Sequence, residues 1–113
     1  MEGIRQAKVS RLIQKEVATL LQLHHNTWCL GHLVTVTVVR TSADLMDVKI
    51  YLSVFPPEKA KITHQNLVAI LPEIRLELGK KVKKSLRRVP NLLFYIDDSL
   101  DYAMEIQDLL NKK

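Results

Sequence analysis

The strongest chemical signal in this sequence is a cluster of cations between Glu73 and Tyr95. The stretch EIRLELGKKVKKSLRRVPNLLFY holds seven basic residues: Arg75, Lys80, Lys81, Lys83, Lys84, Arg87 and Arg88. Only Glu73 and Glu77 oppose them, so the stretch carries an excess of +5, which equals the formal charge of the whole 113-residue chain. A local excess of this kind is typical of a surface that binds a polyanion, and nucleic acid is the first polyanion to consider.

A second and weaker group of cations lies near the N-terminus. A helix from about Ile4 to Leu23 would carry four of them on one side: Arg5, Lys8, Arg11 and Lys15. The opposite side of that helix is apolar: Val9, Ile13, Val17, Leu20 and Leu21. A basic stripe like this one is usually a solvated outer face, so we treat it as a secondary candidate for RNA contacts.

Metal binding is the next chemistry to test. Four potential ligands lie within nine residues: His24, His25, Cys29 and His32. A structural zinc site usually pairs two spaced ligands with a second such pair elsewhere, and His64 is the only other candidate of this kind. Trp28 and Leu30 flank Cys29, which favours a small buried side chain in a loop that faces the core. We expect neither a metal nor a cofactor.

Asp97 and Asp98 are the remaining residues that invite a catalytic interpretation. Together with Ser99 they precede an apolar periodic segment that ends near Leu110, and capping such a helix is the commoner use of these residue types. The sequence contains no nucleophile elbow, phosphate loop or zinc pattern. We therefore expect a protein that is not an enzyme.

Composition limits the class of protein. An apolar fraction of 47% is normal for a globular domain, and no apolar run approaches the ~20 residues that a membrane span needs. The first residues, MEGIRQAKVSRLIQKE, carry charges throughout, unlike a secretory signal. A single cysteine cannot form an internal disulfide and suits a reducing compartment. We expect one soluble, cytoplasmic, monomeric domain over residues 1–113.

The middle of the chain has the pattern of a hairpin. LVTVTVVR, from Leu33 to Arg40, is rich in β-branched residues, and its alternation places Val34, Val36 and Val38 on one face. DVKIYLSVF, residues 47–55, repeats the alternation. The six residues between these runs are short enough for an antiparallel connection, so we expect a two-stranded hairpin with one buried face.

A helical region and a third strand follow. Pro56-Pro57-Glu58 ends the second strand and favours a helix start. One narrow apolar stripe then recurs at helical spacing: Leu67, Leu71, Ile74, Leu78 and Val82. Pro72 falls inside it and must break or kink the helix, which we expect to reach about Lys84. NLLFYI, residues 91–96, predicts the third strand.

The predicted order is helix, strand, strand, kinked helix, strand, helix. A strand, a long helix and a second strand indicate a crossover connection. Three strands with helices on one face make a two-layer α+β domain.

This order and several motifs resemble the bacterial ribosome-binding factor A family. The most specific part is Leu78-Gly79 followed by Arg88-Val89-Pro90-x-Leu92-x-Phe94 and then by the acidic pair with Ser99. The resemblance covers nearly the whole chain. It implies a type II KH-like fold, binding to the small ribosomal subunit and its rRNA, and a non-catalytic role in late maturation of that rRNA, at a site that other assembly factors could share.

Ordinary KH domains hold RNA with a Gly-x-x-Gly loop, which this chain cannot form because its only glycines are Gly3, Gly31 and Gly79. The resemblance implies an Ala-x-Gly kink between the central helices instead. Here Ile70-Leu71-Pro72 stands at that place, and proline offers a different physical cause for the same break.

Two hypotheses for function remain. The first is an RNA-binding assembly factor that holds rRNA phosphates with Arg75, the lysine cluster, Arg87 and Arg88. The alternative is a protein interaction module that docks on an acidic partner without contacting RNA. Nuclease treatment separates them, because an association between proteins alone survives it.

Overall fold

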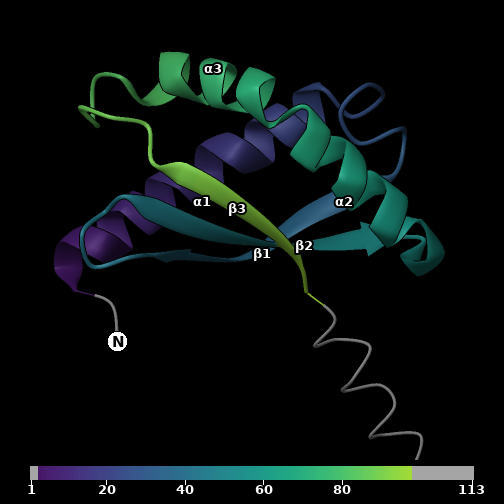
Figure 1. The fold of residues 1–113 in the computed structure, drawn as a ribbon, viewed down its shortest axis with the longest axis horizontal. Helices are drawn as coiled ribbons and strands as arrows, with labels where there is room; N and C mark the ends of the chain where they lie inside the picture. The colour runs from purple at the N-terminus through teal and green to yellow at the C-terminus, as the bar shows by residue number, and fades with distance from the viewer. Residues whose placement is uncertain (1–2, 98–113) are drawn as a thin grey trace, which may run out of the picture.

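The computed structural model describes residues 3–97, in which helices and strands follow the predicted order (Figure 1). The elements are α1 (Ile4–Leu23), β1 (Leu33–Thr41), β2 (Asp47–Phe55), η1 (Pro57–Lys59), α2 (Ala60–Ala69), α3 (Leu71–Val82) and β3 (Asn91–Ile96). The expected α+β class is confirmed, although α3 ends at Val82 and not near Lys84. The helix expected after Asp97 and Asp98 lies outside the described residues.

The three strands form one sheet in the order β1-β2-β3. Strands β1 and β2 are the antiparallel pair expected from the hairpin pattern. Strand β3 lies parallel to β2, and η1, α2 and α3 form the crossover between them. The helices cover one face of the sheet, which gives two layers (Figure 1).

The alternation predicted for β1 is wrong beyond Val36. Val36 pairs with Leu52 and Val38 pairs with Tyr51, so Thr37 is an extra residue in the first strand. Such a bulge changes which side chains point inward. As a result Val39 is buried, whereas Val38 is only half-buried. A run of β-branched residues contains no local signal for this slip.

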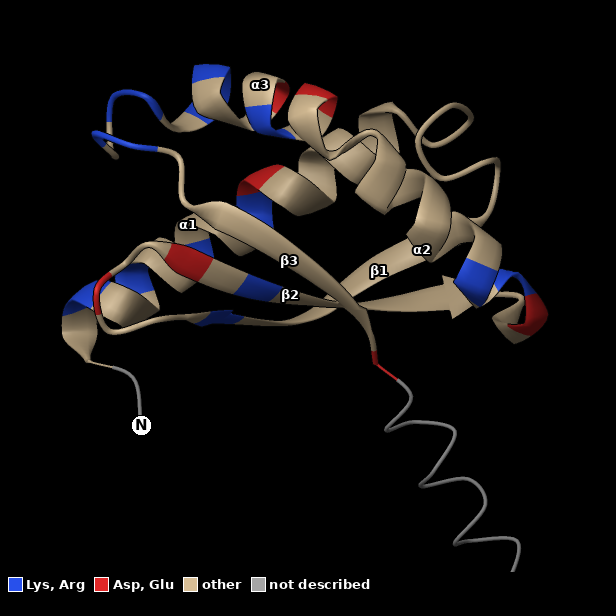
Figure 2. Cartoon of the chain, viewed as in Figure 1, with Lys and Arg blue, Asp and Glu red and all other residues tan. Residues whose placement is uncertain are grey.

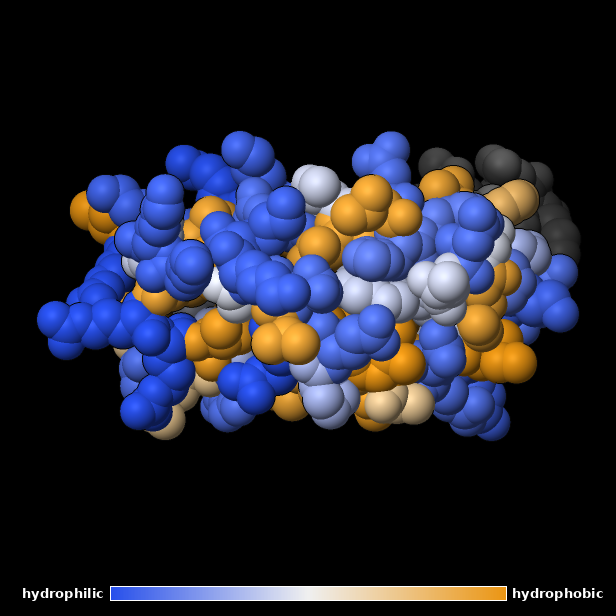
Figure 3. Space-filling model, turned by 90° about the horizontal axis from the view of Figure 1, so that it is seen from above, coloured by the Kyte–Doolittle hydropathy of each residue, from blue (hydrophilic) through white to orange (hydrophobic). Residues whose placement is uncertain are grey.

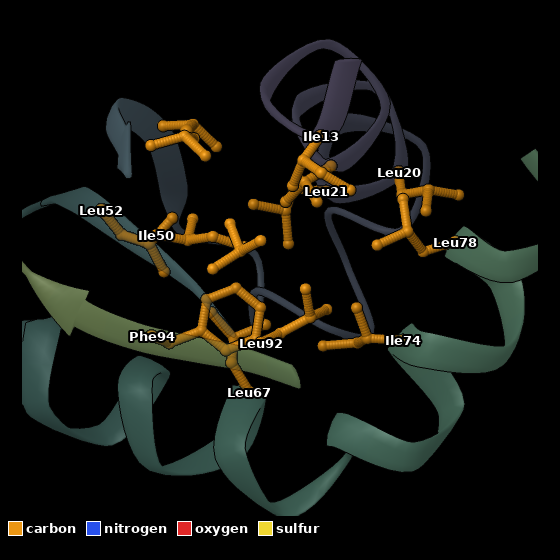
Figure 4. Packing of buried hydrophobic residues seen from close by; sticks show 14 of the residues in the cluster. Ile13, Leu20, Leu21, Ile50, Leu52, Leu67, Ile74, Leu78, Leu92 and Phe94 are labelled. Carbon is orange, nitrogen blue, oxygen red and sulfur yellow. The ribbon is translucent and has the colours of Figure 1, made fainter. Parts of the chain in front are cut away.

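The core lies between the sheet and the helices (Figure 4). All five residues predicted for the apolar side of α1 are buried: Val9, Ile13, Val17, Leu20 and Leu21. Leu20 of α1 faces Leu78 of α3 in Figure 4, and Ile50, Leu92 and Phe94 line the sheet side. Burial of each large apolar side chain stabilises the fold by about 1.5–3 kcal/mol relative to exposure.

The helix break expected at Pro72 is present and is centred on Ile70. Helix α2 ends at Ala69, α3 begins at Leu71, and Ile70 between them has φ −98° and ψ 15°. Pro72 is the second residue of α3, where its missing N–H removes no intrahelical hydrogen bond. Leu67 before the break and Ile74 after it are both fully buried, so each segment packs separately on the core.

Ring stacking and hydrogen bonds hold the loop between α1 and β1 in place. The ring of His24 stacks on that of Trp28 with centroids 3.9 Å apart, and the Asn66 side chain donates to the Trp28 carbonyl at 2.8 Å. Cys29 is buried as predicted, with its thiol 3.6 Å from the carbonyl oxygen of Leu21. Burial raises the pKa of the Cys29 thiol to about 11, so the group stays neutral.

Candidate nucleic-acid interface

Three segments that are distant in the sequence meet at one end of the molecule. They are the beginning of α1, the turn between β1 and β2, and residues 83–90 between α3 and β3 (Figure 1). Helices α1 and α3 contact each other and run in opposite directions, so the cationic end of α3 lies near the cationic beginning of α1. Figure 2 shows Lys and Arg on both elements at this end, and Figure 3 shows hydrophilic residues gathered there.

Six cations follow one another along the end of α3 and the segment after it. Lys80 and Lys81 lie in the last helical turn, and the other four lie beyond it: Lys83, Lys84, Arg87 and Arg88. All six are exposed or half-buried at most. The N–H groups of Ser85 and Leu86 both donate to the Val82 carbonyl at 2.8 Å, so the chain turns immediately after the helix. The turn presents the charges from an ordered backbone.

Little of this charge is neutralised. The one ion pair within residues 3–97 joins Lys80 Nζ to Glu77 Oε1 at 3.4 Å, and the lysine side chain is 63% exposed. Exposed pairs of this kind contribute about 0–1 kcal/mol, because water screens them. Lys80 therefore remains available to an external anion, and the five cations that follow it have no carboxylate partner in the described part of the chain.

Arg75 differs from the other predicted contacts. It is half-buried, and its guanidinium donates to the Val89 carbonyl at 2.9 Å. Its Nε is buried and has no hydrogen-bond partner among residues 3–97. Arg75 therefore holds the segment after α3 against that helix and in this way positions Arg87 and Arg88. Gly79 assists the same approach, because a Cβ at that position would lie 3.2 Å from a methyl carbon of Val89.

A cavity of about 440 Å³ opens where the three segments meet. Arg5 of α1 lines it together with Arg87 and Arg88, which are more than 80 residues away in sequence. The two cationic groups seen in the sequence are thus joined through Arg5. Lys8, Arg11 and Lys15 are exposed along α1 but do not line the cavity.

Asp44 of the β1–β2 turn lines the same cavity. Its Oδ1 accepts hydrogen bonds from the Ser42 hydroxyl at 2.6 Å and from the Met46 N–H at 3.0 Å. The Ser42 bond, followed by the Met46 bond, lowers the pKa of Asp44, so this group is ionised near neutral pH. Asp44 is one of the six residues predicted to connect the first two strands, but its place in the cavity could not be predicted, because no local pattern links residue 44 to residue 88.

The kink residues lie at the other end of α3 from the lysines. Ile70 and Leu71 are half-buried, and Pro72 is exposed. The structure therefore does not bring the predicted kink together with the cationic cluster.

Other chemistries leave no matching arrangement in the described region. Across residues 3–97, no three His, Cys, Asp or Glu side chains gather as a possible metal site. His32 instead shares a 2.9 Å hydrogen bond with Thr63, and His64 Nε2 lies 2.7 Å from the carbonyl oxygen of Phe94. No helix within residues 3–97 is long and apolar enough to span a membrane.

Comparison with known proteins decides the family. A family model described as ribosome-binding factor A matches residues 5–110. The chain belongs to the ribosome-binding factor A family. Ribosome-binding factor A of Flavobacterium johnsoniae is 41% identical over 114 residues, which is all of this chain and 88% of the relative. The Cytophaga hutchinsonii protein of the same name is 37% identical over 112 residues, covering 99% of this chain and 84% of the relative.

Solved structures of ribosome-binding factor A have the same fold. The crystal structure of the Thermus thermophilus protein matches with a TM-score of 0.66 at 23% identity, covering 80% of this chain and 94% of that one. A homology model of Thermus thermophilus ribosome-binding factor A, fitted into a cryo-EM map of a 30S complex, gives 0.65 at 22% identity, covering 80% and 93%. At these identities the likeness concerns the fold.

Proposed function

We propose that this protein is a non-catalytic assembly factor that binds the small ribosomal subunit through its rRNA in the cytoplasm and assists late maturation of that rRNA. Membership of the ribosome-binding factor A family supports the first part, as does the relative of the same fold fitted into a map of its 30S complex. The contacts proposed for rRNA phosphates are the cations at the end of α3 and beyond it, with the α1 stripe as a second contact surface.

One observation carries the proposal that the contact is with RNA. Five successive cations of the cluster, from Lys81 to Arg88, have no carboxylate partner within residues 3–97. Cationic side chains that contact phosphates displace the counterions condensed on RNA, which gives sequence-independent affinity for RNA. Arg75 contributes indirectly, because its guanidinium is committed to the Val89 carbonyl.

Co-sedimentation tests the binding. The purified protein is mixed with small subunits, and its pelleting is measured before and after nuclease digestion. In a second experiment, its retention is measured on rRNA from which the ribosomal proteins have been stripped. We expect pelleting with intact subunits and retention on protein-free rRNA. Pelleting that survives complete digestion, with no retention on bare rRNA, would replace this function by docking on an acidic protein partner.

The role in maturation requires a separate test. In cells depleted of the protein, precursor forms of the small-subunit rRNA should accumulate, and re-expression should remove them. Purified protein incubated with that precursor should leave it uncut. Cleavage by the pure protein would overturn the non-catalytic assignment.

A further inference from the structure

The cavity between α1, the β1–β2 turn and the segment after α3 brings three arginines and one aspartate together. Its volume of about 440 Å³ lies within the range usual for small-molecule sites, about 300–1,000 Å³. It combines a charged rim with apolar side chains: Val9, Leu86 and Pro90 line it together with the three arginines. A site for a bare anion would not need these apolar surfaces.

The walls of the cavity are held by hydrogen bonds. The Asn91 N–H donates to the Met46 carbonyl at 2.7 Å, which joins the β1–β2 turn to the start of β3. On the other wall, the Ser85 and Leu86 N–H groups donate to the Val82 carbonyl. The arginines therefore extend from fixed backbones, so binding would have to order only their side chains.

The charges in the cavity are available to a ligand. Within residues 3–97, the guanidiniums of Arg5, Arg87 and Arg88 make no hydrogen bond and no ion pair. A guanidinium can donate two parallel hydrogen bonds to a phosphate or a carboxylate, and a phosphate group offers more oxygens than a carboxylate to three guanidiniums around one cavity.

Asp44 indicates which chemical group of the ligand lies beside that phosphate. The hydrogen bonds from Ser42 and Met46 both end on Oδ1, so its second oxygen can still accept one. A carboxylate weakens a pure phosphate site but stabilises a ligand that presents a hydroxyl next to its phosphate. In RNA the ribose 2′-hydroxyl is adjacent to the 3′-phosphate, and this hydroxyl distinguishes RNA from DNA.

We propose that this cavity binds one ribonucleotide of the rRNA. The 3′-phosphate contacts Arg5, Arg87 and Arg88, the 2′-hydroxyl donates to Asp44, and the apolar parts of sugar and base lie against Val9, Leu86 and Pro90. This inference rests on the proposed function, because it assigns part of the rRNA contact to a defined cavity.

Isotope-labelled full-length protein is titrated separately with adenosine 3′-monophosphate, with its 2′-deoxy analogue and with inorganic phosphate. Binding is measured from the changes in amide NMR chemical shifts. We expect saturable shifts at residues 5, 44–46 and 85–88. The ribonucleotide should bind at least fivefold more tightly than the deoxy analogue and than phosphate. Arg5→Gln should weaken ribonucleotide binding at least fivefold.

Two variants make the test specific. Arg40→Gln is the matched control for Arg5→Gln, because Arg40 of β1 is an exposed arginine that neither lines the cavity nor belongs to the proposed rRNA contacts. It should leave the titration unchanged. Asp44→Asn keeps an oxygen acceptor for Ser42 and Met46 but can remove the second acceptor, so it should erase the preference for ribose. Equal affinity for phosphate and nucleotide, equal losses in the two arginine variants, or shifts outside the cavity would each overturn the proposal.

The same variants in subunit co-sedimentation separate this inference from the proposed function. If the parent binds subunits and Arg5→Gln binds them as well as Arg40→Gln does, the cavity does not hold rRNA and only the inference fails. If the parent does not bind subunits, the proposed function fails, whatever the nucleotide titration shows. Greater loss in Arg5→Gln than in Arg40→Gln supports both.

Discussion

Neutralising the cations after α3 should reduce both the affinity for rRNA and its salt dependence. The variant replaces Lys83, Lys84, Arg87 and Arg88 by glutamine. All four are exposed, and none makes a hydrogen bond or ion pair within the described residues, so their replacement leaves the core untouched. Arg75 is kept, because its bond to Val89 supports the segment that carries the arginines.

The expected magnitude follows from counterion release. Each phosphate contact contributes about 0.7–0.9 to the slope of log affinity against log salt, so four contacts contribute roughly 3. Relative to about 1 M salt, a slope of roughly 3 corresponds to about a thousandfold in affinity at about 0.1 M salt. This is the upper bound on the affinity that four contacts contribute. Some of these side chains will reach phosphates only part of the time, so we expect a loss of at least tenfold.

The assay is binding of labelled protein to small subunits over a series of salt concentrations. The matched control removes four exposed cations outside the proposed contacts, with Arg40, Lys49, Lys59 and Lys61 replaced by glutamine, and so has the same net charge. We expect the control to lose less affinity and to keep most of the slope. Thermal melts of both variants should match the parent.

Equal losses in the two variants would refute the reasoning. In that case net charge, and not the placement of cations at one end, would govern binding. A parental slope in the cluster variant would likewise remove these four side chains from the contact surface.

The remaining expectations concern Arg75, Pro72, Cys29 and metal. Replacing Arg75 by Met should lower the free energy of unfolding by about 1–3 kcal/mol in urea titrations, because the Val89 carbonyl loses its donor; no change would mean that the bond contributes nothing. Replacing Pro72 by Ala should extend helical structure across Ile70, visible as added amide protection, and should weaken subunit binding more than it lowers stability. Cys29 should react with a thiol reagent at pH 8 only after unfolding, because it is buried and has a pKa of about 11, which leaves about one thiolate in a thousand. Because burial disfavours the thiolate, the free energy of unfolding should be unaffected by Cys29 below pH 9 and should fall as the pH rises from 9 to 11. Prolonged dialysis against a chelator should change neither the melting temperature nor subunit binding.

Helices were predictable where one face is apolar and the other charged. The five core residues of α1 follow from periodicity alone, because a helix that packs on a sheet must bury one stripe. The break before α3 was predictable because proline acts on the backbone locally, whatever surrounds it. The positions of the three strands also followed from local residue types, to within one residue.

The bulge at Thr37 and the role of Arg75 depended on tertiary structure. A strand register is chosen by its partner, so nothing within β1 could show that Val39 and not Val38 faces the core. Likewise, Arg75 belongs to a cationic run in sequence, and only the approach of Val89 to α3 turns its guanidinium toward a backbone carbonyl.

The sequence by itself determined that this protein carries an uncompensated cationic stretch on ordered elements, since charge and periodicity are local properties. It could not show that Arg5 belongs with Arg87 and Arg88, or that Asp44 stands among them. That arrangement exists because α1 and α3 pack in opposite directions on one sheet and because β3 pairs beside the turn of the β1–β2 hairpin. Contacts between residues so far apart in the chain are set by the packing of whole elements, which only the tertiary structure decides.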